Sequence, residues 1–238
     1  MKLYYLKIYM PKNFLKTIYF DTSKIWENKF INEIEVFKNI TSLDLEQPIT
    51  YFIWENGSGK STLLENIATS FWFNKEWGTK NSFYQTNAED NLENNWIQLS
   101  WQPTKFQYWY FFRAEWIYNF INYLENISWF HPYGWENLHN MSHGQQFLRI
   151  FESQMNSVWF YILDEIESAL SPENQLKVVE IIKYMVSKWS QFLIATHSPI
   201  ILNIKNNSQI LSFDYWYIHE IEYEFAPCVD IYKRLFKN

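Results

Sequence analysis

The chain has 238 residues, which is long enough to bury a sizeable core, and we expect one α/β domain spanning residues 1–238. Its formal net charge of −6 and pI near 5.4 exclude an overall basic field. Nucleic acid is therefore a possible partner, but the charge of the chain gives no support for it. Neither a secretory signal core nor a run of about 18 apolar residues is recognisable, so we expect no direct membrane insertion. The single cysteine, Cys228, suits a reducing compartment, and we expect a cytoplasmic protein.

The balance of tryptophan and glycine is unusual. The chain has 13 tryptophans and only 5 glycines, whereas average usage is about 7% glycine. Trp189, just past a predicted helix, and Trp216, in a predicted hairpin turn, stand where glycine is favoured. With few arginines and abundant Lys, Asn and Ile, the coding sequence is expected to be AT-rich. We hypothesise that UGA encodes glycine in the source organism and is rendered here as tryptophan; the alternative is a truly tryptophan-rich protein.

In the first half of the chain, a loose alternation predicts a strand over residues 3–9, followed by a stretch without clear pattern to residue 45. Residues 73–104 are rich in Asn, Gln, Ser and Thr, so we expect a surface excursion there. The remaining expected elements are a buried strand over 49–53, a helix over 60–71, a strand over 105–112 and a helix over 114–125.

The second half shows clearer periodicity. Helices are predicted over 141–154 and 173–188, the latter with Leu176, Val179, Ile182 and Met185 on its apolar stripe. Strands are predicted over 158–163 and 191–195, and a closing hairpin over 209–213 and 217–221. Because strands alternate with helices, we expect a mostly parallel central sheet covered on both faces. Residues 72–157 are expected to form a less regular, partly helical subdomain.

The strongest local pattern is Gly-x-x-x-x-Gly-Lys-Ser over residues 54–61, with Trp54 in place of the first glycine. Such a loop binds phosphate through backbone amides and the positive end of the helix that follows. Lys60 would pair with the β- and γ-phosphates, and the Ser61 hydroxyl would ligate Mg²⁺. The expected nucleotide-binding residues here are Trp54, Glu55, Asn56, Gly57, Ser58, Gly59, Lys60, Ser61 and Thr62. A glycine-bearing turn without a ligand is the simpler alternative.

Two acids follow the apolar run of residues 160–163. The carboxyl ends of parallel strands are where α/β sheets bind ligands, so a strand delivering Asp164 and Glu165 there suits catalysis. Asp164 would hold Mg²⁺ through its water shell, and Glu165 would polarise the attacking water. A strand that ends in a solvated acidic turn is the alternative.

The segment Met141-Ser142-His143-Gly144-Gln145-Gln146 resembles the signature of ABC ATPases. Residues 168–171 resemble the D-loop of that family, and residues 195–199 resemble its switch-histidine segment, so that the resemblance spans residues 49–200. The ending of the chain resembles small stand-alone ABC-type ATPases that are often labelled AAA-family. This implies a P-loop NTPase fold, an ABC-type head with an antiparallel β-portion, which uses ATP and Mg²⁺.

The same resemblance implies a site shared between two subunits. An ATP-dependent homodimer would sandwich two nucleotides, and Ser142, Gly144 and Gln145 of one subunit would reach the nucleotide of the other. Ser142 is also a good helix N-cap, and a helix start favours an anion. His197 would donate a hydrogen bond to the γ-phosphate, so Lys60, Glu165 and His197 are the expected catalytic residues. A capping serine and a structural histidine are the alternatives.

The chain departs from the family pattern at two positions. His143 replaces the usual second glycine of transporter signatures, and Ile166 replaces the common proline after the paired acids. The residue of the Q-loop stays open among Gln85, Gln98, Gln102 and Glu115.

The leading expectation is a soluble ATPase whose ATP-driven dimerisation and hydrolysis switch a protein partner that the sequence does not identify. Alternatives are the ATP-binding subunit of a membrane transporter, an ATPase related to DNA-repair and chromosome-maintenance proteins, and a nucleotide sensor that does not hydrolyse ATP. The long coiled-coil insertion of the DNA-repair relatives has no room between Lys60 and Ser142.

Overall fold

A computed structural model describes residues 13–53, 57–70, 96–102, 109–114, 141–155, 160–214 and 216–236. These residues form two sheets. The first is antiparallel, in the order β2-β1-β4, and the second has six strands in the order β5-β6-β7-β3-β8-β9. Strands β3, β5, β6, β7 and β8 run parallel to their neighbours, and β9 pairs antiparallel with β8. The expected α/β class with a mostly parallel sheet and an antiparallel portion is confirmed.

The strands are β1 (Leu15–Phe20), β2 (Ser42–Asp44), β3 (Ile49–Ile53), β4 (Ile97–Trp101), β5 (Trp109–Arg113), β6 (Phe160–Asp164), β7 (Gln191–Ala195), β8 (Ser208–Phe213) and β9 (Ile218–Glu220). The helices are α1 (Thr22–Glu27), α2 (Glu35–Lys38), α3 (Lys60–Ser70), α5 (His143–Gln154), α6 (Pro172–Ser187) and α7 (Pro227–Leu235). Short 3-10 turns are η1 (Ile31–Glu33), η5 (Ile166–Ala169), η6 (Ile201–Asn203) and η7 (Tyr223–Phe225).

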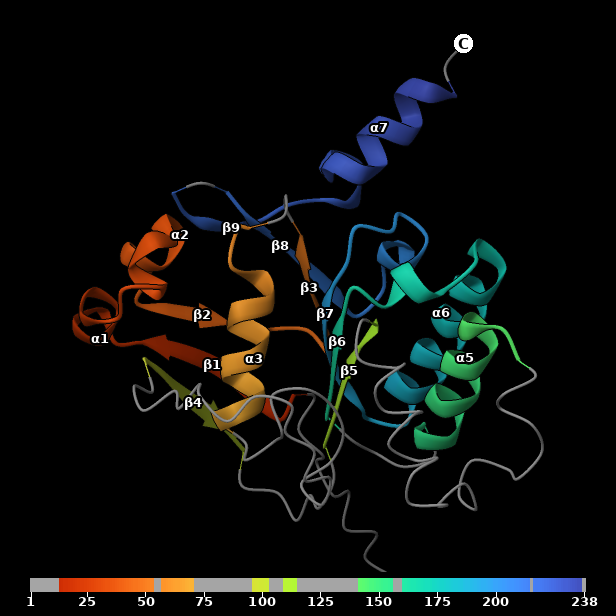
Figure 1. Ribbon diagram of the computed structural model, residues 1–238, viewed down its shortest axis with the longest axis horizontal. Helices are drawn as coiled ribbons and strands as arrows, with labels where there is room; N and C mark the ends of the chain where they lie inside the picture. The colour runs from red at the N-terminus through yellow and green to blue at the C-terminus, as the bar shows by residue number, and fades with distance from the viewer. Residues whose placement is uncertain are drawn as a thin grey trace, which may run out of the picture.

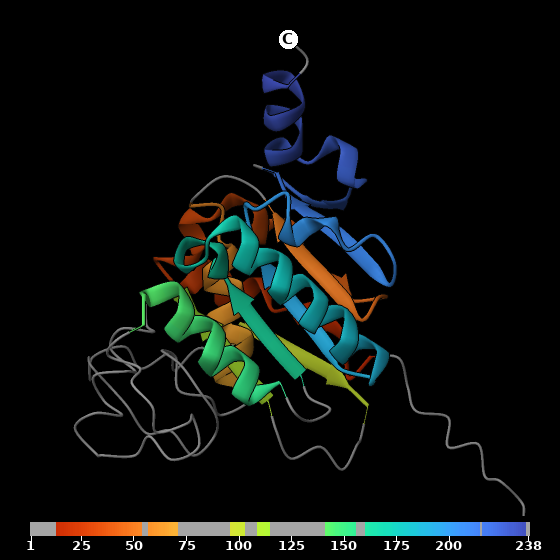
Figure 2. The ribbon, with the colours of Figure 1, turned by 90° about the vertical axis from the view of Figure 1, so that its right-hand side faces the viewer.

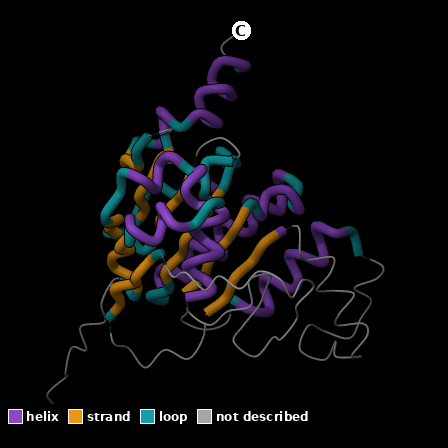
Figure 3. The backbone as a smooth tube through the Cα atoms, turned by 60° about the vertical axis from the view of Figure 1, so that its left-hand side comes forward, coloured by secondary structure: helices purple, strands orange, loops and turns teal. Residues whose placement is uncertain are grey.

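Helices cover both faces of the six-stranded sheet. One face packs with α3 and with the first sheet, and the opposite face packs with α5 and α6. Figure 1 shows α3 between the two sheets, with α5 and α6 beyond the six-stranded one, and Figure 2 shows α5 and α6 in front of its strands. Figure 3 shows the two groups of strands in orange, with helix between and beyond them. Because both faces are covered, every residue of β3, β6 and β7 is buried.

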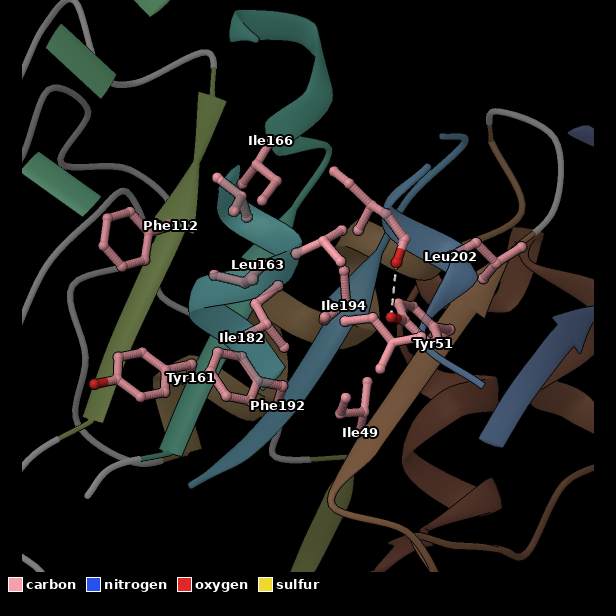
Figure 4. Packing of buried hydrophobic residues seen from close by; sticks show 14 of the residues in the cluster. Ile49, Tyr51, Phe112, Tyr161, Leu163, Ile166, Ile182, Phe192, Ile194 and Leu202 are labelled. Atoms are coloured by element: carbon pink, nitrogen blue, oxygen red, sulfur yellow. Dashed lines mark hydrogen bonds between the residues drawn. The ribbon is translucent and has the colours of Figure 1, made fainter. Parts of the chain in front are cut away.

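The core beneath α6 is built from alternate residues of the parallel strands. Tyr51, Leu163 and Ile194, from three strands, gather with Ile182 of α6 (Figure 4). The Tyr51 hydroxyl is fully buried and donates a 2.8 Å hydrogen bond to the carbonyl of Ile201. This bond satisfies the one polar atom that the tyrosine brings into an otherwise apolar layer.

Two buried glutamines fasten the first sheet and its connection to β3 onto the six-stranded sheet. Gln191 Oε1, at the start of β7, accepts the N–H groups of Phe14 at 2.8 Å and Leu15 at 2.9 Å. Its Nε2 donates to the Leu15 carbonyl at 2.9 Å. Gln209 of β8 repeats the arrangement with the backbone of residues 44–47. Each side-chain amide therefore pairs with backbone groups that have no neighbouring strand to bond to.

The structure confirms the predicted strand over 49–53, the helix over 60–71, both later helices, the strand at 191–195 and the closing hairpin. The strand expected over 158–163 is present as β6, and that over 105–112 as β5, with residues 103–108 and 156–159 outside the described ranges. The expected strand over 3–9 also lies outside them, as does the helix over 114–125 except Ala114. Of residues 72–157, the described parts are β4, β5, α5 and short flanks.

Two expectations were wrong. The polar stretch 73–104 contains β4, which pairs with β1 because Trp96 and Ile97 at its start are buried against that strand's aromatic side. In α6, Leu176 is 56% exposed, and Gln175 is buried in its place. Gln175 can lie inside because its Nε2 donates to the Leu170 carbonyl and its Oε1 accepts the Ser198 hydroxyl.

Helix α7 projects away from the body of the molecule (Figures 1 and 2). Among the described residues, no helix is both long enough and apolar enough to cross a membrane.

We expect Gln191→Met to lower the free energy of unfolding by about 2–5 kcal/mol, because methionine keeps the volume but leaves three buried backbone groups unpaired. Urea titration followed by circular dichroism measures this. Gln98→Met, at an exposed position of β4, is the matched control and should change stability by less than about 0.5 kcal/mol. Equal stabilities of the two variants would contradict the fastening role.

Candidate active site

The phosphate-loop sequence lies between β3 and α3, with residues 54–56 outside the described ranges. Gly57 and Gly59 have φ of +84° and +94°, which L side chains rarely adopt. A Cβ on Gly59 would also lie 2.8 Å from the side chains of Ile34 and Phe37. The Leu63 N–H donates to the Gly59 carbonyl at 2.9 Å, so the helix begins directly after the loop. The strand, glycine turn and helix of a P-loop are therefore in place.

Lys60 and Ser61 open this helix facing the sheet. Lys60 is 3% exposed, and its Nζ donates to the Ser58 hydroxyl at 3.4 Å. Burial lowers the pKa of Lys60, while the carboxylates of Glu165, Asp164 and Glu167 act in the opposite direction. The ammonium group of Lys60 thus lies at the start of α3, and such a group can pair with phosphate oxygens. Thr62, the last residue of the loop pattern, lies in the same first turn of α3.

Four parallel strands end side by side at the edge where α3 begins. The register places Arg113 of β5 beside Asp164 of β6, and Asp164 beside Ala195 of β7, which in turn lies beside Phe52 of β3. The chain segments that follow these strands carry Glu165, His197 and the glycine turn. The topology thus gathers the expected catalytic residues from distant parts of the sequence at one edge of the sheet.

Asp164 is the most buried acid of the site. It is 2% exposed; its Oδ1 accepts the Ser61 hydroxyl at 3.1 Å, and its Oδ2 accepts the Arg113 Nε–H at 2.9 Å. Burial raises the pKa of Asp164 to about 6, against the opposing effects of the Arg113 charge and the Ser61 hydrogen bond. The ion pair therefore compensates only part of the cost of burying the carboxylate.

Glu165 turns sharply out of β6. Its φ of +47° is left-handed, which is uncommon for a residue other than glycine, and its N–H donates to the Ala195 carbonyl at 3.0 Å. Glu165 Oε1 lies 3.5 Å from His197 Nε2, and both side chains are partly exposed. Burial, followed by the nearby Lys60 charge, lowers the pKa of His197, so the imidazole is neutral near pH 7. Glu165 and His197 form a partly exposed pair at the sheet edge that carries the buried Asp164.

Glu167 is a site residue that the sequence reasoning missed. It accepts the backbone N–H of His197 at 2.5 Å and bonds the Thr196 hydroxyl, and burial raises its pKa. Glu167 therefore connects η5 to the segment after β7 and fixes the position of the His197 backbone. The run Asp-Glu-x-Glu was the available signal, because the third acid falls within one turn of the paired acids.

Arg113 was also missed. It is one of few arginines in the chain and directly follows an apolar run, which is the position where a charged residue reaches a sheet edge. The Q-loop candidates Gln98 and Gln102 lie in and just after β4, which belongs to the first sheet and not to the edge that carries Asp164. Gln85 and Glu115 fall outside the described residues.

The signature-like segment starts α5 on the opposite face of the sheet from α3. Ser142 Oγ accepts the Gln145 N–H at 3.4 Å, and the Gln145 side chain accepts the Ser142 N–H at 2.9 Å, a reciprocal capping box. A Cβ on Gly144 would lie 2.8 Å from the carbonyl oxygen of Ala169, so glycine is required for α5 to approach η5 this closely. The expected capping role of Ser142 is thus present within one chain.

The donor set suits Mg²⁺ completed by phosphate. Ser61 and Asp164 offer hard oxygen ligands within 3.1 Å of each other. Mg²⁺ commonly binds one or two protein oxygens together with substrate phosphates and water. Among the described residues, no group of three or more His, Cys, Asp or Glu side chains is placed to hold a metal ion.

No protein-family model and no curated protein matches this sequence. Solved structures with similar folds include an SMC head domain from Thermotoga maritima, at 16% identity and TM-score 0.49, covering 88% of this chain and all of that one. Another is cbiO1 from Clostridium perfringens, part of the ABC transporter complex cbiONQ, at 14% identity and TM-score 0.47, covering 82% of this chain and 86% of that one. A third is MJ1267, an ATP-binding cassette of an ABC transporter, at 19% identity and TM-score 0.46, covering 92% and 98%. Similarities of this size assign no activity to the chain.

We expect Asp164→Asn to stabilise the metal-free protein relative to wild type progressively as pH rises from about 4 to about 7. A carboxyl whose pKa is raised on folding keeps its proton longer in the native state, so its burial costs nothing below the unfolded pKa and most above the folded one. The rise of the Asp164 pKa from 3.8 to about 6 corresponds to a difference in the free energy of unfolding of about 3 kcal/mol at most. Urea unfolding in EDTA at several pH values measures the difference, and a difference independent of pH would contradict the cost assigned to this carboxylate.

Proposed function

We propose that this chain is an ABC-type ATPase that binds ATP with Mg²⁺ and hydrolyses it as a nucleotide-driven dimeric switch. One observation carries the proposal: the Ser61 hydroxyl bonds Asp164, with buried Lys60 in the same turn of α3 and the Glu165–His197 pair at the same sheet edge. A glycine-bearing turn alone would not need a lysine, a serine and three acids converging beyond the ends of four strands.

Each residue has a chemical role that follows from its place. The amides of the loop and the start of α3 bind phosphate oxygens, and Lys60 pairs with the β- and γ-phosphates. Ser61 and Asp164 would hold Mg²⁺, which supplies charge neutralisation on the phosphates. Glu165 orients the attacking water and accepts its proton, because it is the accessible carboxylate of the pair. His197, neutral and 3.5 Å from Glu165, can donate to the γ-phosphate.

The dimeric part of the proposal concerns Ser142, Gly144 and Gln145. These residues start a helix that packs on the face of the sheet opposite to α3. A second copy that presented this helix start to the nucleotide would supply amide groups and the positive end of the helix dipole to the γ-phosphate. Such an interface would bring two copies together only when ATP is bound. Its switching would act on a protein partner in the cytoplasm, where a lone thiol stays reduced.

We also propose that tryptophans in this sequence stand where the natural protein has glycine. Trp189 supports this, because its φ of +74° is left-handed and it follows α6 at the position where glycine ends helices. The Ser190 N–H reaches back to the Met185 carbonyl at 3.0 Å, which is the bond of the glycine-terminated motif. Trp96 does not add support, because its ring is fully buried against Phe20 and Phe37, although its indole nitrogen has no hydrogen-bond partner among the described residues. Trp216 adds none, because its φ is not positive.

Glu165→Gln should slow ATP hydrolysis by about 100-fold or more, because a general base of this kind contributes about two to four powers of ten. The variant should still bind ATP and accumulate as a dimer, measured by phosphate release and by light scattering on a sizing column with ATP and Mg²⁺. Glu173→Gln, at an exposed position of α6, is the matched control and should hydrolyse ATP at the wild-type rate.

Hydrolysis at the wild-type rate in Glu165→Gln would remove Glu165 from its role. Tight ATP binding without phosphate release in the wild type would instead indicate the nucleotide sensor. Trp54 in the loop pattern and Ile166 in place of proline are the two departures that favour this alternative.

Trp189→Gly should raise the free energy of unfolding by about 1 kcal/mol, because glycine adopts a left-handed φ without the cost that a Cβ adds. Thermal unfolding measures it, with Trp216→Gly as the control that should give no such gain. Mass spectrometry of the protein from its natural source decides the wider proposal: a mass that matches tryptophan at all 13 positions would refute it.

A further inference from the structure

Arg113 joins two acids that belong to different elements of the site. Its Nε–H donates to Asp164 Oδ2 at 2.9 Å, and its Nη1–H donates to Glu65 Oε1 at 2.5 Å. The arginine side chain is 16% exposed, Asp164 is 2% exposed, and Glu65 is 31% exposed. The guanidinium therefore lies between a buried carboxylate on β6 and a partly exposed carboxylate on α3.

These contacts close a ring through one turn of helix. Ser61 and Glu65 are four residues apart on α3, so their side chains leave the helix on the same face. Ser61 bonds one oxygen of Asp164, Arg113 bonds the other, and Glu65 holds the far end of the arginine. The ring consists of two side chains from α3 and one each from the ends of β5 and β6.

The ring fixes the direction of the Asp164 carboxylate. With Oδ2 occupied by Arg113, the group cannot rotate, and Oδ1 stays directed at the Ser61 hydroxyl. Ser61 and Asp164 are the two oxygen donors that we assign to Mg²⁺. The planar guanidinium holds its hydrogen bonds to Asp164 and Glu65 in a fixed relative geometry. The ammonium of a lysine, on a flexible side chain, cannot do this.

We propose that Arg113 is a positioning residue of the metal site, which acts through Asp164 and is itself anchored by Glu65. The inference rests on the proposed function, because it assumes that Asp164 and Ser61 serve Mg²⁺. In this role Arg113 would act through the Asp164 carboxylate and not by contacting nucleotide or metal itself. It determines how well the two donors are arranged before the metal arrives, as outer partners of metal ligands do in other sites.

The test measures the Mg²⁺ concentration that gives half-maximal binding of a fluorescent, non-hydrolysable ATP analogue to the full chain. Arg113→Met should raise this concentration about 10- to 100-fold. Binding of the analogue in EDTA should change less than about twofold, because the loop and Lys60 remain. Arg113→Lys should recover only part of the loss, since it restores the charge without the fixed geometry. Arg234→Met, which removes an exposed arginine from α7, is the matched control and should match wild type.

Steady-state hydrolysis gives a second readout. In Arg113→Met, kcat measured at saturating Mg²⁺ should recover toward wild type while the Mg²⁺ requirement stays raised, whereas general damage to the fold would lower kcat at every Mg²⁺ concentration. If Arg113→Met does not fold, Arg113→Lys and Glu65→Gln decide, and both should raise the half-saturating Mg²⁺ concentration about threefold or more.

Unchanged Mg²⁺ dependence in folded Arg113→Met, or in both Arg113→Lys and Glu65→Gln, overturns the inference while the proposed function stands. A wild-type chain that binds no analogue with Mg²⁺ overturns the proposed function, and this inference with it.

Discussion

A carboxylate held out of water at the end of β6 is the constraint around which the site is organised. Asp164 could be buried more cheaply as an amide, and burial raises its pKa to about 6. The protein keeps the acid and surrounds it with a serine hydroxyl from α3 and a guanidinium from β5. The pairing of β5 with β6 serves this need, because the register of the two parallel strands brings Arg113 and Asp164 side by side. In the function that we propose, stability is given up at a position where the charge would serve chemistry, as is common in active sites.

The phosphate loop depends on parts of the chain that carry no catalytic residue. Gly59 turns against Ile34 and Phe37, which belong to the segment between β1 and β2. That segment is held in turn by the first sheet, which Gln191 fastens to the start of β7. The small antiparallel sheet therefore supports the loop. Loss of the Gln191 hydrogen bonds would loosen the packing of Ile34 and Phe37 against Gly59 before it disturbed the strands that carry the acids.

Local sequence patterns predicted those elements whose residues are determined by a single physical requirement. Buried parallel strands are continuous apolar runs, so residues 49–53 and 191–195 were predictable, as were the glycine turn and the acids that end β6. β4 was missed although Ile97, Leu99 and Trp101 alternate with Gln98 and Ser100, because it lies in a long polar stretch and pairs with β1, which is distant in the sequence. The predicted apolar stripe included Leu176 and omitted Gln175, because the hydrogen-bond partners that allow Gln175 to be buried, Leu170 and Ser198, lie outside α6. Arg113 and Glu167 were missed for the same reason: their roles are set by residues brought near only by the fold.

The short turn η5 touches three functional parts at once. It begins directly after Glu165, it is bonded through Glu167 to the backbone of His197, and its last residue, Ala169, lies against Gly144 at the start of α5. The four residues of η5 thus connect the Glu165–His197 pair directly to α5, the helix that we propose a second copy contacts. Since Gly144 leaves no space for even a methyl group against the Ala169 carbonyl, α5 has no slack against η5. A shift of Glu165 or His197 would displace the start of α5 directly, so in the dimer that we propose the fit of the two copies would depend on the nucleotide.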